Sequence, residues 1–207
     1  MKLFDEKFRS SLYETIGKLE SESQIEAVVI IKNKSGDYSP WAFVVAAAVA
    51  FLLFTFYMFA PIDFNPYFMF VSSIVVFALV LFLLKKSDAL LSKFVPSRIK
   101  EKNVEIYARA IFQKGHIYNT GEHTGVLFYC SVFERQTVVI PDWGITLSVP
   151  EQEMQAIVGR FSKVFKSDNP ADDILQALAF VSPIFAESIP HRDDDINEIP
   201  DDLDVDL

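Results

Sequence analysis

The sequence holds one cysteine in 207 residues, and this scarcity excludes a fold held together by its own disulfide bonds. A lone thiol is typical of a protein in a reducing compartment. Cys130 stands in the apolar stretch FYCSV. We therefore expect it to be a small buried side chain rather than a nucleophile.

Recognised catalytic motifs are also lacking. The sequence has no G-x-S-x-G, no P-loop, no G-x-G-x-x-G and no H-x-x-x-H. Of three histidines, His116 and His123 fall in a predicted loop and His191 precedes the C-terminal tail. A general base at His123, beside Glu122, is the one acid–base hypothesis, set against an ordinary solvated loop histidine. These absences favour a protein without catalysis of its own.

Basic residues are missing from segment 193–206, which holds eight acids. The chain carries a net charge of −9, yet outside this segment 20 of the 28 acids face 19 basic residues. The body is therefore nearly neutral, and no basic, aromatic-rich surface points to nucleic acid. Such acidic stretches rarely fold alone, so 191–207 is predicted to be a disordered tail. Within it, Asp193, Asp194 and Asp195 are candidate contacts for a basic partner.

Charge is absent from two long apolar runs, 41–60 and 67–84. A helix of about 20 residues spans roughly 30 Å, the thickness of a bilayer core. The linking sequence PIDFNP is rich in turn formers. The pattern predicts a transmembrane helical hairpin over 41–84, followed by an interfacial segment over 85–95. The first residues contain no apolar secretory core, so we expect no cleavable signal peptide.

The flanks of the hairpin predict its orientation. Lys32 and Lys34 precede the first run, several Lys and Arg residues follow the second, and the turn has no basic residue. By the positive-inside rule, both termini and the soluble domain are expected on the cytoplasmic side of a bacterial inner membrane. Because neither run contains an ionisable residue, the hairpin suits an anchor better than an oligomeric small transporter.

The remaining sequence predicts an α/β domain. Apolar residues at helical spacing indicate helices over Phe4–Leu19, Val104–Phe112, Met154–Phe165 and Ile174–Phe185. The stretch IEAVVII indicates a buried strand, GVLFYCSV and TVVIP indicate a hairpin, and Gly144 marks the turn after it. One strand before the hairpin and two after it are too few to stand apart. We therefore predict one discontinuous domain, 1–38 plus 96–190, with a small mixed sheet sandwiched by helices.

Three blocks of sequence carry a resemblance to a known family. These blocks are LESESQIEAVVI, the long stretch ARAIFQKGHIYNTGEHTGVLFYCSVFERQTVVIPDWGI, and INEIPDD. In this order they resemble the TPM-domain family, specifically its membrane-embedded bacterial branch. The resemblance implies an α/β sandwich with a small mixed sheet. It also implies three possible activities, since family members are described as phosphatases, as calcium-binding proteins, or as accessory factors of membrane complexes.

A divalent cation, Ca²⁺ or Mg²⁺, is the one cofactor hypothesis. Hard cations prefer clustered oxygen ligands, and Glu26, Glu122 and Asp142 are the acids expected near the end of the sheet, with His123 and Asp37 as further candidates. An ion pair for Glu26 and a turn cap for Asp142 are the alternatives. A metal-dependent phosphatase of the TPM type would use this site.

The stretch FERQ between the two later strands places Glu134 and Arg135 at a predicted hairpin tip. We expect them either to keep the turn soluble or to contact a partner. The function predicted first is a membrane-anchored accessory protein that presents a cytoplasmic TPM-like domain to another membrane protein or to further copies of itself.

Overall fold

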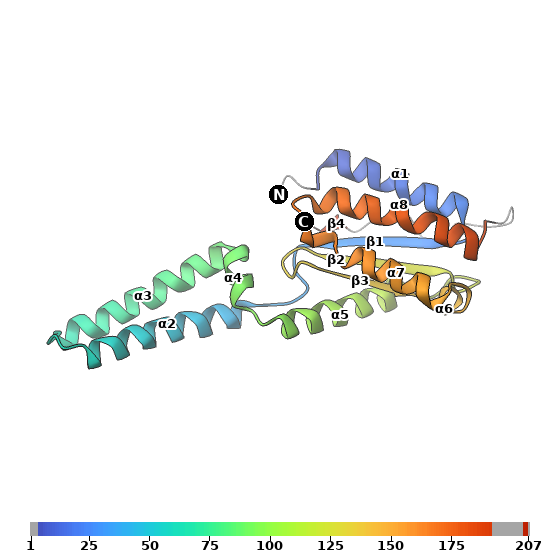
Figure 1. Cartoon of the computed structure of the whole chain (residues 1–207). Helices are drawn as coiled ribbons and strands as arrows, with labels where there is room; N and C mark the ends of the chain where they lie inside the picture. Colours follow the sequence, from blue (N-terminus) through green and yellow to red (C-terminus); the bar gives the residue numbers. More distant parts are fainter. Residues whose placement is uncertain (1–3, 192–204, 207) are drawn as a thin grey trace. The chain divides into compact units, whose positions relative to one another are not determined.

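The computed structural model describes residues 4–191 and 205–206. The chain divides into two units, Met1–Ser35 with Glu101–Leu207, and Gly36–Lys100. We call the first the α/β unit and the second the hairpin unit. The second lies between two parts of the first in sequence, so the α/β unit is built from both ends of the chain (Figure 1).

The described helices and strands include all those predicted, and several of them have different ends. In chain order they are α1 (Glu6–Glu22), β1 (Glu26–Lys32), α2 (Ser39–Phe59), α3 (Pro66–Lys86), α4 (Asp88–Phe94), α5 (Ser97–Lys114), β2 (Gly125–Ser131), β3 (Gln136–Pro141), α6 (Trp143–Ser148), α7 (Glu151–Phe161), the 3-10 turn η1 (Val164–Lys166), α8 (Pro170–Ser188) and β4 (Val205–Asp206).

The sheet of the α/β unit is mixed, with strand order β3-β2-β1-β4. β1 pairs with β2 in parallel, and Glu26 lies opposite Gly125. β2 and β3 form an antiparallel hairpin in which Val126 lies opposite Pro141. The predicted α/β class with a small mixed sheet is therefore confirmed. The two residues of β4 pair with the end of β1, and the rest of the predicted tail lies outside the described residues.

Helices cover both faces of this sheet, which makes a three-layer arrangement. α1 and α8 lie on one face and α5 on the other (Figure 1). The first face packs the larger core, in which Val29 and Phe128 meet residues from α1, α7 and α8. The second face packs Leu127 and Tyr129 against Val104 of α5. β1 and β2 are apolar on both faces because each face is covered.

Local signals explain where the helices begin. The Asp5 side chain accepts a hydrogen bond from the Phe8 N–H at 2.9 Å, which caps α1. The Asn65 side chain accepts one from the Tyr67 N–H at 2.9 Å at the start of α3. Pro66 occupies the first turn of α3, and Pro170 that of α8, where the missing N–H has no cost.

The hairpin unit consists of α2 and α3, which pack along each other, and the short α4. Both long helices have the length and apolarity needed to span a membrane, and only 11% of the most apolar window of each is buried. Ala42 and Ala46 of α2 are fully buried, so small side chains lie where the helix packs closely. Lys85 lies 4.8 Å from the ring centre of Phe43 near the open end of the hairpin.

Two local predictions are wrong. Gly144 was predicted to mark a turn, but it lies within helix α6. A Cβ on Gly144 would stand 2.3 Å from the Glu122 carbonyl oxygen, so the glycine allows a close approach of two backbones. The predicted helix Met154–Phe165 ends at Phe161, and Val164 and Phe165 continue it as buried residues of a 3-10 turn.

Candidate functional site

A cluster of polar side chains is buried where β1 and β2 end. The Ser35 hydroxyl lies 2.8 Å from the Tyr129 hydroxyl and donates to the Ser131 hydroxyl at 2.8 Å. Ser131 in turn donates to the Glu134 carboxylate, which also accepts the Ser35 N–H at 2.9 Å. We call these four residues the buried polar cluster. It joins the segment after β1 to the turn between β2 and β3.

Burial changes the acidity of two neighbours in β2. Desolvation raises the pKa of Tyr129 to about 12, although hydrogen bonds from Ser35 and Ser131 oppose the shift. Desolvation alone raises the pKa of the Cys130 thiol to about 12. Cys130 is fully buried, as expected. A thiol that stays protonated and inaccessible is a poor nucleophile.

Glu134 and Arg135 lie in the turn between β2 and β3, as predicted, but only Arg135 is exposed there. Glu134 is only 4% exposed and belongs to the buried polar cluster. Arg135 adopts a left-handed backbone conformation, with φ of 54°, and its guanidinium donates to the Phe165 carbonyl. The buried carboxylate of Glu134 thus stabilises the turn through its hydrogen bonds with Ser35 and Ser131. The partner-binding role of these two residues stays a prediction, as does that of Asp193, Asp194 and Asp195, which lie outside the described residues.

At the opposite end of the sheet, two of the predicted polar residues meet. The His123 Nδ1 atom lies 3.0 Å from an Asp142 carboxylate oxygen, and the exposed fractions of the two side chains are 55% and 12%. The other Asp142 oxygen accepts the Trp143 N–H at 2.7 Å and so caps α6. His123 has a positive φ of 57°. Asp142 therefore caps α6, which was the alternative to its predicted role as a metal ligand. It also contacts His123.

The predicted metal ligands come from the same end of the sheet. Glu26 begins β1 opposite Gly125, and the Asp142 N–H donates to the Gly125 carbonyl at 2.9 Å. Within residues 4–191 and 205–206, however, no three His, Cys, Asp or Glu side chains form a group that could hold a metal ion. The cation site built from Glu26, Glu122 and Asp142 stays a prediction.

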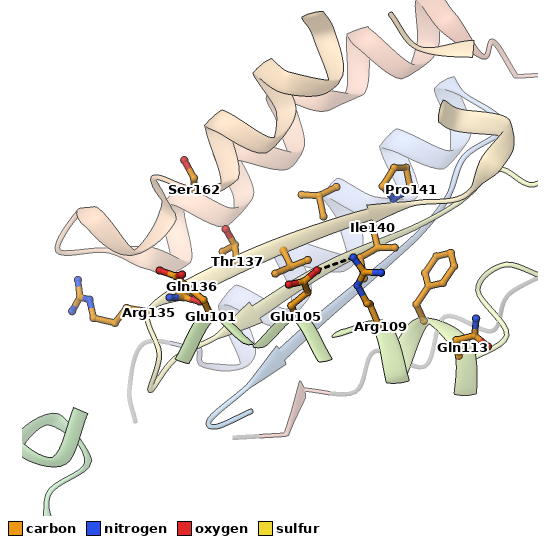
Figure 2. Close-up of a pocket in the computed structure, with 13 residues that line it drawn as sticks. Glu101, Glu105, Arg109, Gln113, Arg135, Gln136, Thr137, Ile140, Pro141 and Ser162 are labelled. Carbon is orange, nitrogen blue, oxygen red and sulfur yellow. Dashed lines mark hydrogen bonds and ion pairs between the residues drawn. The ribbon is translucent and has the colours of Figure 1, made fainter. Parts of the chain in front are cut away.

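A groove that the sequence did not predict runs along β3. It has a volume of about 820 Å³, and α5 forms one wall (Figure 2). Glu101, Glu105 and Arg109 line it from α5, all of β3 lines it, and Ser162 at the end of α7 closes the other side. The Glu105 and Arg109 side chains form an ion pair at 2.7 Å. We call this feature the edge groove.

The described geometry defines a class of protein: an α/β sandwich whose sheet is interrupted in sequence by an apolar helical hairpin. Its fold is similar to the NMR structure of the BA42 protein from the psychrophilic bacterium Bizionia argentinensis, with a TM-score of 0.60. The two share 16% sequence identity, and the match covers 97% of this chain and 94% of the other. At that identity the likeness concerns the fold alone.

Comparisons by sequence add nothing to this result. No protein-family model matches the chain, and no curated protein sequence matches it.

Proposed function

We propose that this chain is a membrane-anchored accessory protein. Its hairpin unit crosses a bacterial inner membrane, and its α/β unit contacts a partner protein on the cytoplasmic side. The observation that carries the proposal is the exposure of α2 and α3. Their large apolar side chains face outward, and Phe51, Phe59 and Phe70 are 69%, 84% and 64% exposed. Exposed apolar surface of this extent needs a lipid or protein environment.

Three further features support the proposal. α2 contains no charged residue, and α3 carries only Lys85 and Lys86 at its end. A span without ionisable groups has no relay for ions or protons. The basic residues at both ends of the hairpin support the cytoplasmic orientation. The resemblance of the sequence to the membrane-embedded branch of the TPM-domain family supports an accessory role.

One experiment tests for partner proteins, and a second tests the orientation in the membrane. The tagged full-length chain is cross-linked in intact membranes, solubilised in mild detergent and captured, with a tagged two-span membrane protein of similar size as control. We expect discrete partners absent from the control. A clean monomer without cross-linked products would contradict the proposal. Protease digestion of the C-terminal tail in inside-out vesicles tests the orientation, and digestion only in spheroplasts would reverse it.

A metal-dependent phosphatase is the second candidate, and the contact between His123 and Asp142 is the observation that favours it. Assays of the purified chain with Mg²⁺, Mn²⁺ and Ca²⁺ compare the wild type with Asp142→Ala. A metal-dependent activity that this substitution abolishes would support the phosphatase. An activity that the substitution leaves unchanged would remove this site from consideration.

A further inference from the structure

The outer edge of the sheet at β3 has backbone groups available for another strand. In the part of the chain that the structure describes, β3 is the last strand on its side of the sheet. The Asp142 N–H bonds to the Gly125 carbonyl, and in an antiparallel pair such bonded positions alternate. Gln136, Val138 and Ile140 therefore direct their N–H and C=O groups toward β2. Thr137 and Val139 direct theirs outward, into the edge groove.

At one end of this edge, a backbone N–H donor is missing. Pro141 has the same outward parity as Thr137 and Val139, and it has no N–H. The available edge is thus short, with two donors supplied by Thr137 and Val139. Natural proteins blunt or cover exposed edges because an open edge pairs readily with another chain. Among the described residues, no strand pairs with the outward side of Thr137 and Val139, and the edge groove lies beside them.

The side chains of β3 divide between the two faces. Val138 and Ile140 pack partly against the core beneath α5, while Val139 packs against the larger core. All six residues of β3 are half-buried. An added strand would continue both faces, with alternate side chains directed toward α5. Its residues opposite Val138 and Ile140 would cover the remaining apolar surface, and Phe112 would extend that contact.

The charge on α5 indicates which side chain an added strand would carry opposite Gln136. Figure 2 shows Glu101 at the Gln136 end of the groove, and Arg109 and Gln113 toward the Pro141 end. Glu105 already pairs with Arg109, and Arg135, which also lines the groove, donates its guanidinium to the Phe165 carbonyl of η1. A residue opposite Gln136 on the α5 side would therefore meet the exposed carboxylate of Glu101. A basic side chain fits there.

We propose that the edge groove binds an extended segment of a partner protein by adding it antiparallel to β3. The segment has two apolar residues two positions apart, followed two positions later by Lys or Arg. This inference rests on the proposed function and names the partner surface. Backbone hydrogen bonds to Thr137 and Val139 supply affinity, and the alternate side chains supply specificity.

Two other occupants fit less well. The C-terminal tail is acidic and would bring like charge to Glu101, and its described residues Val205 and Asp206 pair with β1 at the other edge. A second copy would pair β3 with itself, which places Ile140 of the copy rather than a basic residue opposite Gln136.

The test uses the full-length chain in detergent and fluorescent heptapeptides measured by anisotropy. In the main probe, threonine alternates with two valines and then a lysine. The first control replaces the lysine by glutamate. The second control methylates the backbone nitrogens of the two threonines that would face Thr137 and Val139. We expect the lysine peptide to bind about fivefold more tightly than the glutamate peptide, since each exposed charge contact contributes about 0.2–1 kcal/mol. The methylated peptide should not bind.

Two protein variants complete the design. Glu101→Lys reverses the peptide preference, because it changes the charge on an exposed helix position without touching β3. Thr137→Pro removes an outward donor and abolishes binding, and circular dichroism confirms that each variant is folded. The proposal is overturned if no peptide binds saturably, if methylation has no effect, or if Glu101→Lys leaves the preference unchanged. It is also overturned if Thr137→Pro instead dissociates a dimer, which would identify a second copy as the occupant.

The result is separable from the proposed function. A chain that captures partners in membranes but binds none of these peptides would keep its accessory role and lose the edge groove as the docking surface. A chain that binds the lysine peptide but yields no cross-linked partner would keep the groove and lose the accessory role in that membrane.

Discussion

Large apolar side chains are mostly buried in the α/β unit and mostly exposed in the hairpin unit. In the α/β unit, Phe128 is fully buried and stacks on Phe161 with ring centres 4.7 Å apart. In the hairpin unit, Phe70 is 64% exposed. The polar parts differ as well, because the α/β unit buries the four residues of the buried polar cluster, whereas α2 and α3 satisfy hydroxyls such as Thr55 on their own backbone. The α/β unit thus buries its large apolar side chains within itself, whereas α2 and α3 leave many of theirs exposed.

The largest expected effect comes from removing a core aromatic ring. Phe128→Ala should lower the free energy of unfolding of the α/β unit by about 3–5 kcal/mol, because it leaves a cavity in the sheet. Phe70→Ala is the matched control and should leave that free energy unchanged. Denaturant unfolding in detergent, followed by circular dichroism, measures both. Equal losses of unfolding free energy in the two variants would contradict the difference between the two units.

Placing a charge on the hairpin is next in size. Leu79→Arg should reduce membrane integration, since an arginine near the middle of a span costs about 2.5–3.5 kcal/mol. Leu147→Arg is the control, since Leu147 is 67% exposed on α6 and Leu79 is 54% exposed on α3. Carbonate extraction of membranes followed by immunoblotting gives the integrated fraction. If Leu147→Arg had the larger effect, α6 rather than α3 would contact the membrane.

The buried polar cluster provides a third test. Glu134→Ala leaves the Ser35 N–H and the Ser131 hydroxyl without their acceptor, and we expect a loss of about 1–3 kcal/mol. Glu101→Ala removes an exposed carboxylate and should change stability by less than about 0.5 kcal/mol. Both are measured from denaturant midpoints. A neutral Glu134→Ala would show that the cluster contributes nothing to the stability of the α/β unit.

The smallest effect is a dependence on pH. Because burial raises the pKa of Tyr129 from 10.0 to about 12, the unfolded chain releases this proton before the folded chain does. The contribution of the neutral phenol is intact below pH 10.0 and is lost as pH rises through about 12. Tyr129→Phe should therefore flatten the fall in stability in that window, and Tyr118→Phe should not. Denaturant midpoints across the window decide, and identical slopes would contradict the assignment.

Much of the fold was predictable because its signals are local. The strand IEAVVII is apolar on both faces, and helices cover both faces of β1. The two uncharged runs became α2 and α3 within two residues of the predicted ends. The spacing of Phe8, Leu12, Ile16 and Leu19 gives the buried face of α1. Composition and periodicity suffice for such elements.

The predictions that failed depend on partners distant in sequence. Glu134 was expected at an exposed turn, and no neighbour in sequence reveals that Ser35 donates to it from 99 residues away. Gly144 was predicted to mark a turn, yet the close approach of the Glu122 and His123 carbonyls requires a glycine at this position within α6. The edge groove was missed for a related reason, since the position of β3 at the sheet edge follows from strand order rather than from its residues.

The parallel pairing of β1 with β2 has a consequence for the order in which the molecule is made. A ribosome releases β1 before the hairpin and β2 after it, so the nascent strand has no hydrogen-bonding neighbour while the whole of α2 and α3 is being synthesised. Helices form from near neighbours, whereas this strand pair must close a long loop. The hairpin is therefore synthesised before the sheet can be completed. In a newly made chain, β1 therefore stays without its β2 partner until the second half of the chain has been synthesised, and unpaired strand edges of this kind are prone to aggregate.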